Sequence, residues 1–331
     1  MVTIRTIDAH TAGEPLRLII DGFPEPQGAT MLEKREWLRE HHDELRTAIM
    51  LEPRGHADMY GALLTASERA DSDAGVLFMH NEGYSTMCGH GVIAVTKLAL
   101  ERGLLRPRTA GTLVLDSPAG PIQARARFGA GQATVSSVAF TNVPSFVLHA
   151  GLPVRINNRD VRVDVAFGGA FYAIVDSEAA GIPVSGTRVD DLRRAGMAIK
   201  DAVEAVIRVE HPLEPALEGI YGTIFTAPPS SERADLRNVT VFAAAEVDRS
   251  PCGTGTCAVM AVLAAMGLLG PEQTFTHESI VGSLFRGRIV GETTVGELPA
   301  IVPEIEGEAF ITGEHTFILD PGDPFVHGFR L

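Results

Sequence analysis

The chain has 331 residues, of which 45% are apolar and 21% charged, and its formal net charge is −14. This length is enough for two domains with separate cores. The acidic balance argues against nucleic acid and anionic membrane surfaces as partners, because both bind through clustered Lys and Arg. Three cysteines are too few for a disulfide framework, and the opening MVTIRTIDAH has no secretory-signal pattern. We therefore expect free thiols and a cytoplasmic location.

The predicted elements are a mixture of helices and strands. Apolar periodicity predicts amphipathic helices over residues 31–46 and 189–209. Short runs rich in β-branched and aromatic residues predict strands, which cover residues 74–79, 111–118, 132–140, 161–167, 170–175, 238–243 and 309–319. The longest apolar run, residues 257–270, is too short to span a bilayer. The pattern is typical of an α/β (α+β) protein.

One segment of the sequence occurs twice, 164 residues apart. CGHGVIAVTKLALERGLL at residues 88–105 aligns without a gap on CGTGTCAVMAVLAAMGLL at residues 252–269. A predicted strand precedes each copy, at 74–79 and 238–243. A weaker repeat relates IDAHTAG at 7–13 to VDVAFGG at 163–169. Because the period is the size of a domain, we interpret the chain as two copies of one α/β unit.

Each copy predicts a helix that starts just after a cysteine. We expect helices over residues 89–102 and 253–266, ended by Gly103 and Gly267, since Gly just past the last turn is a stop signal. The second helix is apolar on all sides and the first nearly so, which predicts burial all round. Cys257 lies inside the second helix, and we expect it to be a packing residue.

A thiol at a helix start has chemical uses. The first turn leaves backbone N–H groups unpaired at the positive end of the helix dipole. That setting lowers the pKa of a cysteine, and the same N–H groups form an anion site for a carboxylate. Two such thiols facing one pocket could invert a carbon stereocentre, with one removing a proton and the other delivering a proton to the opposite face.

The motifs around both cysteines resemble those of a known family. MCGHG at residues 87–91 and DRSPCGTGT at 248–256 are similar to the two signature motifs of the proline racemase superfamily. Further segments that resemble the family's shared blocks lie at residues 7–18, 51–64, 164–175, 277–292 and 319–329, so the resemblance covers almost the whole chain. It implies two pseudo-symmetric domains of the diaminopimelate-epimerase-like fold. Each is a mostly antiparallel curved sheet around a central buried helix, with the active site in the interdomain cleft.

The resemblance also implies domain limits and site residues. The first domain would comprise residues 1–125 plus about 312–331, and the second residues 126–311. Catalysis would need no cofactor and no metal, with Cys88 and Cys252 as the acid/base pair. The residues implied to contact a small imino-acid substrate are Gly89, His90, Asp248, Gly253, Thr254, Tyr60 and Phe242. Asp248 would hold the substrate amine, and backbone N–H groups after each cysteine would hold its carboxylate. A homodimer is compatible with the sequence.

Several activities within the family stay open. Inversion at Cα of proline or a hydroxyproline is favoured by Cys252, because the family's dehydratases typically carry Thr at that position. The alternative is a trans-3-hydroxy-L-proline dehydratase that uses Cys88 as its base. Residues 80–94 and 58–64 are more similar to that branch than to the 4-hydroxyproline branch. The aromatic rings of Tyr60 and Phe242 suit a pyrrolidine that is unsubstituted or substituted only near Cα.

Readings outside this enzyme class are weaker. A non-catalytic imino-acid-binding protein would have no need of two thiols, and a thiol redox sensor would pair Cys88 with Cys252 in a disulfide. Structural zinc usually needs four ligands in closely spaced pairs, and the sequence has no such pairs. The Gly-x-Gly segments lack the Lys-Ser/Thr signature of phosphate-binding loops.

Overall fold

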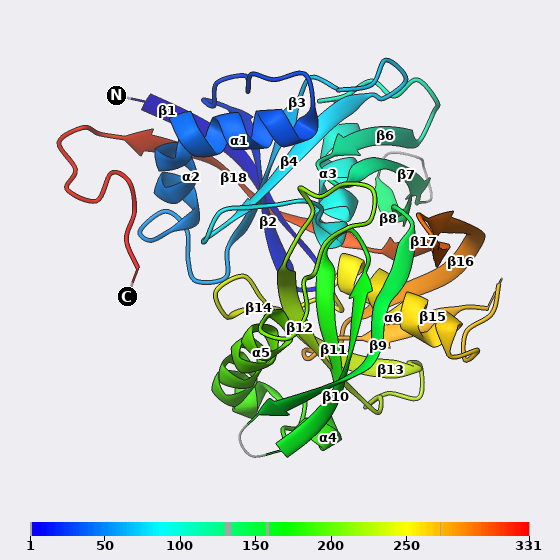
Figure 1. Ribbon diagram of the computed structural model, residues 1–331. Helices are drawn as coiled ribbons and strands as arrows, with labels where there is room; N and C mark the ends of the chain where they lie inside the picture. Colours follow the sequence, from blue (N-terminus) through cyan, green and yellow to red (C-terminus); the bar gives the residue numbers. More distant parts are fainter. Residues whose placement is uncertain (1, 130–133, 157–158, 272, 331) are drawn as a thin grey trace. The chain divides into compact units, whose positions relative to one another are not determined.

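The computed structural model describes residues 2–129, 134–156, 159–271 and 273–330. Its contacts divide the chain into two compact units, Met1–Phe140 with Glu308–Leu331, and Thr141–Gly307. In Figure 1 the second unit is the part that runs from green to orange. The expected domain limits near residues 125 and 312 stay a prediction. Residues 132 and 133 of the predicted strand 132–140 lie outside the described residues.

The first unit is a mostly antiparallel sheet with a helix packed on it. Its helices are α1 (Met31–His41), α2 (Asp43–Met50) and α3 (Gly89–Glu101). Its strands are β1 (Val2–Thr11), β2 (Glu14–Asp21), β3 (Tyr60–Thr65), β4 (Ala74–His80), β5 (Tyr84–Ser85), β6 (Thr112–Ser117), β7 (Gly120–Phe128) and β18 (Ala309–Leu319), with β8 (Val135–Thr141) at the passage to the second unit. The strand order is β18-β1-β2-β3-β4-β6-β7. Helix α3 packs against β1, β2, β3, β7 and β18, so the sheet curves around it.

The second unit repeats this plan. Its helices are α4 (Ser177–Ala180), α5 (Val189–Glu204), α6 (Gly253–Ala265) and the 3₁₀ turn η1 (Gly186–Arg188). Its strands are β9 (Ser145–Ile156), β10 (Arg159–Phe167), β11 (Phe171–Asp176), β12 (Ile220–Ala227), β13 (Leu236–Phe242), β14 (Glu246–Asp248), β15 (Phe275–Glu278), β16 (Leu284–Val295) and β17 (Leu298–Gly307). They pair in the order β9-β10-β11-β12-β13-β15-β16-β17, and β17 pairs with β9. The sheet therefore closes on itself, and α6 packs on strands β9, β10, β11, β16 and β17.

The strand pairings confirm the internal repeat. In the first unit β2 and β3 are parallel, β3 and β4 antiparallel, β4 and β6 parallel, and β6 and β7 antiparallel. The series β11, β12, β13, β15 and β16 has the same alternation. The central helices follow the short hairpins β4–β5 and β13–β14 in the two units. The fold is thus the predicted one, with two pseudo-symmetric units that each surround a central helix.

The two central helices start and stop as the sequence predicts. They begin at Gly89 and Gly253, directly after the cysteines, and residues 253–262 of α6 are all buried. Gly103 and Gly267 have φ values of +64° and +72°, the left-handed conformation that ends a helix at little cost only for glycine. None of the described helices is long and apolar enough to cross a membrane.

The two amphipathic helices differ from the prediction. The expected helix 31–46 is two helices, because the backbone leaves helical geometry at His42, where φ is −143°. Helix α2 is anchored separately: the buried Arg46 guanidinium donates to the carbonyl oxygens of His80 and Asn81 at 2.8 and 2.7 Å. Helix α5 ends at Glu204 rather than near residue 209. The apolar Val209, which extended the predicted helix, is buried in an irregular segment after it.

Candidate active site

Cys88 occupies the N-cap position of α3 and is 5% exposed. Its Sγ atom accepts a hydrogen bond from the backbone N–H of Gly91 at 3.2 Å. A Cβ atom at position 91 would lie 2.8 Å from this sulfur and 2.5 Å from the ring of Phe78, so only glycine leaves room for the contact. The hydrogen bond and the helix N-terminus both place positive partial charge beside the Cys88 sulfur.

His90 adds a second partner for the same sulfur. Its Nδ1 atom lies 3.3 Å from Sγ of Cys88, and its backbone carbonyl accepts from the Thr11 hydroxyl at 2.9 Å. The ring of Tyr60 meets the imidazole edge to face, with 4.8 Å between ring centroids. The Tyr60 hydroxyl donates to Ser85 Oγ at 2.6 Å. Cys88, Gly89, His90 and Tyr60 therefore form one buried cluster in the first unit.

Cys252 occupies the corresponding position of α6 with a different backbone. Its φ of +63° lies in the left-handed region, which is strained for a residue other than glycine. The carbonyl oxygen of Pro251 is held twice, by Asn238 Nδ2 at 2.8 Å and by Thr256 Oγ1 at 3.1 Å. Thr256 in turn hydrogen-bonds to Nδ1 of the fully buried His277 at 2.9 Å. These contacts hold the peptide before Cys252 and so stabilise its strained conformation.

Asp248 is connected to Cys252 through Ser250. The N–H and hydroxyl of Ser250 both donate to Asp248 Oδ1, at 2.8 and 2.7 Å, and the Cys252 N–H donates to Ser250 Oγ at 3.1 Å. Burial raises the pKa of Asp248 to about 6, and the two hydrogen bonds from Ser250 act in the opposite direction. A buried carboxylate with this pKa is suited to bind a cationic group.

Two hydroxyl groups lie beside the Cys252 sulfur. Tyr172 Oη is 3.7 Å and Thr254 Oγ1 3.9 Å from Sγ, and the two oxygens are 2.6 Å apart. Burial, followed by the negative charge of Asp248, raises the pKa of the Cys252 thiol to about 12. Sequence reasoning did not identify Tyr172. A signal was present, because Tyr172 is the one polar-tipped side chain in the otherwise apolar run FYAIV at residues 171–175.

Phe242 joins the second cluster through another aromatic ring. It stacks on Tyr221 with 5.6 Å between ring centroids, and Tyr221 meets Tyr172 nearly at right angles at 6.0 Å. The expected residues Cys252, Gly253, Thr254, Asp248 and Phe242 therefore lie in one region of the second unit. The sequence-predicted site residues thus form two clusters, one at each thiol. That both clusters act on one substrate stays a prediction.

Backbone N–H groups of the two helix starts complete each cluster. In the first turn of an α-helix, several backbone N–H groups have no carbonyl partner within the helix, and this holds for α3 and α6. Gly89 and Gly253 are the first residues of these turns and carry no side chain over them. Such turns can bind a carboxylate group.

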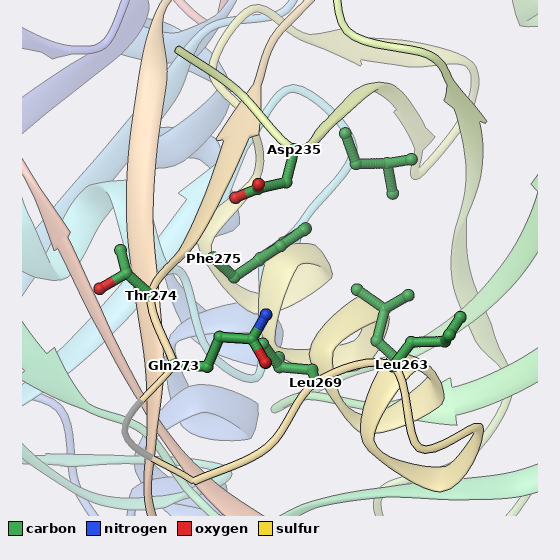
Figure 2. Close-up of a pocket in the computed structure, with 8 residues that line it drawn as sticks. Asp235, Leu263, Leu269, Gln273, Thr274 and Phe275 are labelled. Carbon is green, nitrogen blue, oxygen red and sulfur yellow. The ribbon is translucent and has the colours of Figure 1, made fainter. Parts of the chain in front are cut away.

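Two further features lie away from this chemistry. Cys257 is fully buried, and burial raises the pKa of its thiol, which agrees with a packing role. A hollow of about 210 Å³ lies beside Asp235, Leu263, Gln273 and Phe275, as Figure 2 shows. It is at the opposite end of α6 from Cys252, since Leu263 lies about 16 Å further along the axis at 1.5 Å per residue. The Asp235 carboxylate accepts a hydrogen bond from the Thr276 N–H at 2.7 Å, so it supports the parallel pairing of β13 with β15.

Comparison with known proteins identifies the family. The family model for proline racemase matches residues 6–330. The chain is 48% identical to a trans-3-hydroxy-L-proline dehydratase of Bacillus thuringiensis subsp. konkukian, over 98% of this chain and 97% of that protein. It is 44% identical to a 3-hydroxyproline 2-epimerase of Burkholderia multivorans, over 99% and 98%. A crystal structure of a hydroxyproline epimerase from Agrobacterium vitis, with bound trans-4-hydroxy-L-proline, matches with a TM-score of 0.92 at 32% identity, over 100% of this chain and 95% of that one. The chain therefore belongs to the proline racemase family.

Proposed function

We propose that this protein is a cofactor-independent racemase or epimerase that inverts Cα of proline or a hydroxyproline. The observation that carries the proposal is the duplication of the thiol: each of two topologically matching units starts its central helix with a buried, free cysteine. Membership of the proline racemase family and relatives named as epimerases support it. In the proposal, Cys88 and Cys252 act on opposite faces of one carbon.

The contacts of each thiol suggest a role in the first half-reaction. Cys88, with its N–H donor and neighbouring imidazole, takes the Cα proton as a thiolate. The electron pair of the broken C–H bond passes into the substrate carboxylate. The carboxylate oxygens accept hydrogen bonds from backbone N–H groups at the helix starts. Cys252, as a thiol, then delivers its proton to the other face and the electron pair re-forms a C–H bond. Asp248 holds the substrate ammonium group, and burial of the cluster excludes water that would weaken these interactions.

A dehydratase is the second candidate, and one observation favours it. The two thiols have unequal surroundings, with donors arranged around Cys88 and a high thiol pKa at Cys252. This inequality is compatible with a mechanism that uses a single base. A relative named as a trans-3-hydroxy-L-proline dehydratase also supports the dehydratase candidate. Cys88 would take the Cα proton, the C–H electrons would form the ring double bond, and the 3-hydroxyl would leave as water after protonation by a thiol. The retained Cys252 leads us to place inversion first.

The proposal extends to location and substrate size. A small imino acid is the expected ligand, in agreement with the hydroxyproline bound to the Agrobacterium vitis epimerase. The three free thiols are compatible with the reducing cytoplasm that the sequence predicts. A homodimer stays a prediction.

Heavy water separates these activities. Proline and the cis and trans isomers of 3- and 4-hydroxyproline are incubated with the protein in D₂O, and Cα–H is followed by NMR with chiral analysis. We expect deuterium in the inverted product while the remaining substrate keeps its proton at early times, because two different thiols remove and deliver the proton. Early exchange into substrate as well would indicate a single base. A pyrroline product would assign the dehydratase activity, and absence of both reactions with every ligand would refute the proposal.

A further inference from the structure

Two of the hydroxyl groups beside Cys252 come from different elements of the second unit. Tyr172 comes from β11 and Thr254 from the first turn of α6. The residues Tyr172, Thr254 and Cys252 are 0%, 3% and 6% exposed. The sulfur lies 3.7 Å from Tyr172 Oη, which lies 2.6 Å from Thr254 Oγ1. Water therefore has little access to the sulfur, and these hydroxyls, together with the Gly255 N–H and Thr240, take the place that water would have around an ionised thiol.

We propose that Tyr172 and Thr254 form a rotatable hydroxyl pair that hydrogen-bonds to Cys252 in both its thiol and its thiolate form. The inference rests on the proposed function, in which Cys252 gives up a proton and takes one back in each cycle. It assigns Tyr172 a part in the reaction, as the residue that lets a buried sulfur alternate between two charge states.

The hydrogen-bond directions explain how one geometry serves both states. In the thiol form, the S–H group donates to Tyr172 Oη, and the Tyr172 hydroxyl donates to Thr254 Oγ1. In the thiolate form, the Tyr172 hydroxyl donates to the sulfur and the Thr254 hydroxyl donates to Tyr172 Oη. Each hydroxyl has one donor and two acceptor positions, so only hydrogen atoms move. An ionised group that is buried without such a donor would be strongly destabilised.

The electrostatics agree with this assignment. Burial raises the pKa of Cys252 to about 12, and hydrogen bonds with the Gly255 N–H, Thr240 and Tyr172 act in the opposite direction. Burial also raises the pKa of Tyr172 well above its ordinary value. The phenol therefore keeps its proton and remains a donor, and it does not itself become the base.

The first thiol provides an internal comparison. Cys88 has the Gly91 N–H at 3.2 Å and His90 Nδ1 at 3.3 Å, and both of these contacts come from its own helix. Removing a hydroxyl from Tyr172 changes none of these groups. A change in reactivity that is confined to Cys252 is therefore the signature of the hydroxyl pair.

Alkylation rates of the individual thiols test the inference. Wild type, Tyr172→Phe and Thr254→Val are treated with iodoacetamide between pH 7 and 10, and modification of each cysteine is measured by peptide mass spectrometry. A hydrogen bond to a charged group is strong enough that its loss should slow Cys252 alkylation about tenfold or more in Tyr172→Phe. Thr254→Val should give a smaller decrease. Cys88 should react at the wild-type rate in both variants.

Tyr84→Phe is the matched control. It also removes a phenol hydroxyl, and the Tyr84 hydroxyl has no hydrogen-bond partner among the described residues. We expect it to leave both thiols unchanged. A wild-type Cys252 rate in both Tyr172→Phe and Thr254→Val would overturn the inference, and so would an equal decrease at Cys88. Because alkylation needs no turnover, this result stands apart from the heavy-water assay. A wild-type protein that exchanges no ligand would refute the proposed function alone.

Discussion

Replacement of Ser250 by alanine tests the substrate-amine role of Asp248. The fully buried Ser250 hydroxyl donates to Asp248 Oδ1 at 2.7 Å and accepts the Cys252 N–H at 3.1 Å. Alanine removes both interactions and leaves the backbone N–H of residue 250, at 2.8 Å, and the Cys252 side chain as donors to Asp248. The ionised form of Asp248 therefore loses a charge-assisted hydrogen bond, while the neutral form loses less.

The expected shift can be worked from these contacts. A hydrogen bond to a charged group contributes about 1.5–3 kcal/mol, and 1.36 kcal/mol corresponds to one pKa unit. The pKa of Asp248, which burial raises to about 6, should therefore rise by about one to two units more in Ser250→Ala. At pH 7 most wild-type molecules would have an ionised Asp248, and half or fewer of the variant molecules would.

The assay is the pH profile of kcat/KM for Cα–H exchange, which reports groups of the free enzyme. The acid limb should lie near pH 6 in wild type and move upward by about one to two units in Ser250→Ala, with near wild-type rates restored at pH 9. Ser145→Ala is the control, because it removes an equally buried hydroxyl that donates to the Val143 carbonyl. An acid limb that stays in place in Ser250→Ala, or that moves as far in Ser145→Ala, would refute the reasoning.

Four other variants, with one control, test the site and its support. Cys88→Ser and Cys252→Ser should each lower inversion by orders of magnitude with ligand binding largely kept, as measured by exchange rate and calorimetry; full activity of either would contradict the two-thiol mechanism. Burial lowers the pKa of His277 to about 3, so the folded protein binds fewer protons than the unfolded chain below pH 6.5, and stability falls as the pH drops. His277→Gln should reduce the loss in unfolding free energy between pH 7 and pH 5 by about 2 kcal/mol in urea titrations. In Gly168→Ala the new Cβ would lie 2.2 Å from a backbone carbonyl oxygen of α6, which should cost about 1–3 kcal/mol and slow turnover, whereas Gly186→Ala meets no atom within 4 Å and should do neither.

The helix starts could be predicted because their signals are local. A cysteine, two glycines and an apolar run define the start of each central helix, and Gly103 and Gly267 define its end within one turn. The Asp248–Ser250 turn is also local, since Asp side chains commonly bind the backbone N–H two residues later. Duplication strengthened these signals, because chance agreement at both copies is small.

The contacts that tune Cys252 could not be predicted in the same way. Tyr172 is 80 residues from Cys252 in sequence, and His277 is 21 residues from Thr256. Only the order of strands in the closed sheet brings β11 and β15 next to the start of α6, and no periodicity or turn signal specifies that order. The break at His42 was missed for a related reason, because the Arg46 contacts that orient α2 are with backbone groups after β4.

The duplication also explains why the two thiols are alike in position and unlike in surroundings. The shift of 164 residues that aligns Cys88 with Cys252 aligns His90 with Thr254. Both side chains lie next to the sulfur of their own unit, at 3.3 Å for His90 Nδ1 and 3.9 Å for Thr254 Oγ1. An imidazole can hold a proton and carry a positive charge near neutral pH, whereas a hydroxyl can only redirect its hydrogen. The first sulfur therefore has a neighbour that can carry a positive charge and the second has one that cannot, which is compatible with the proposed abstraction by Cys88 and delivery by Cys252.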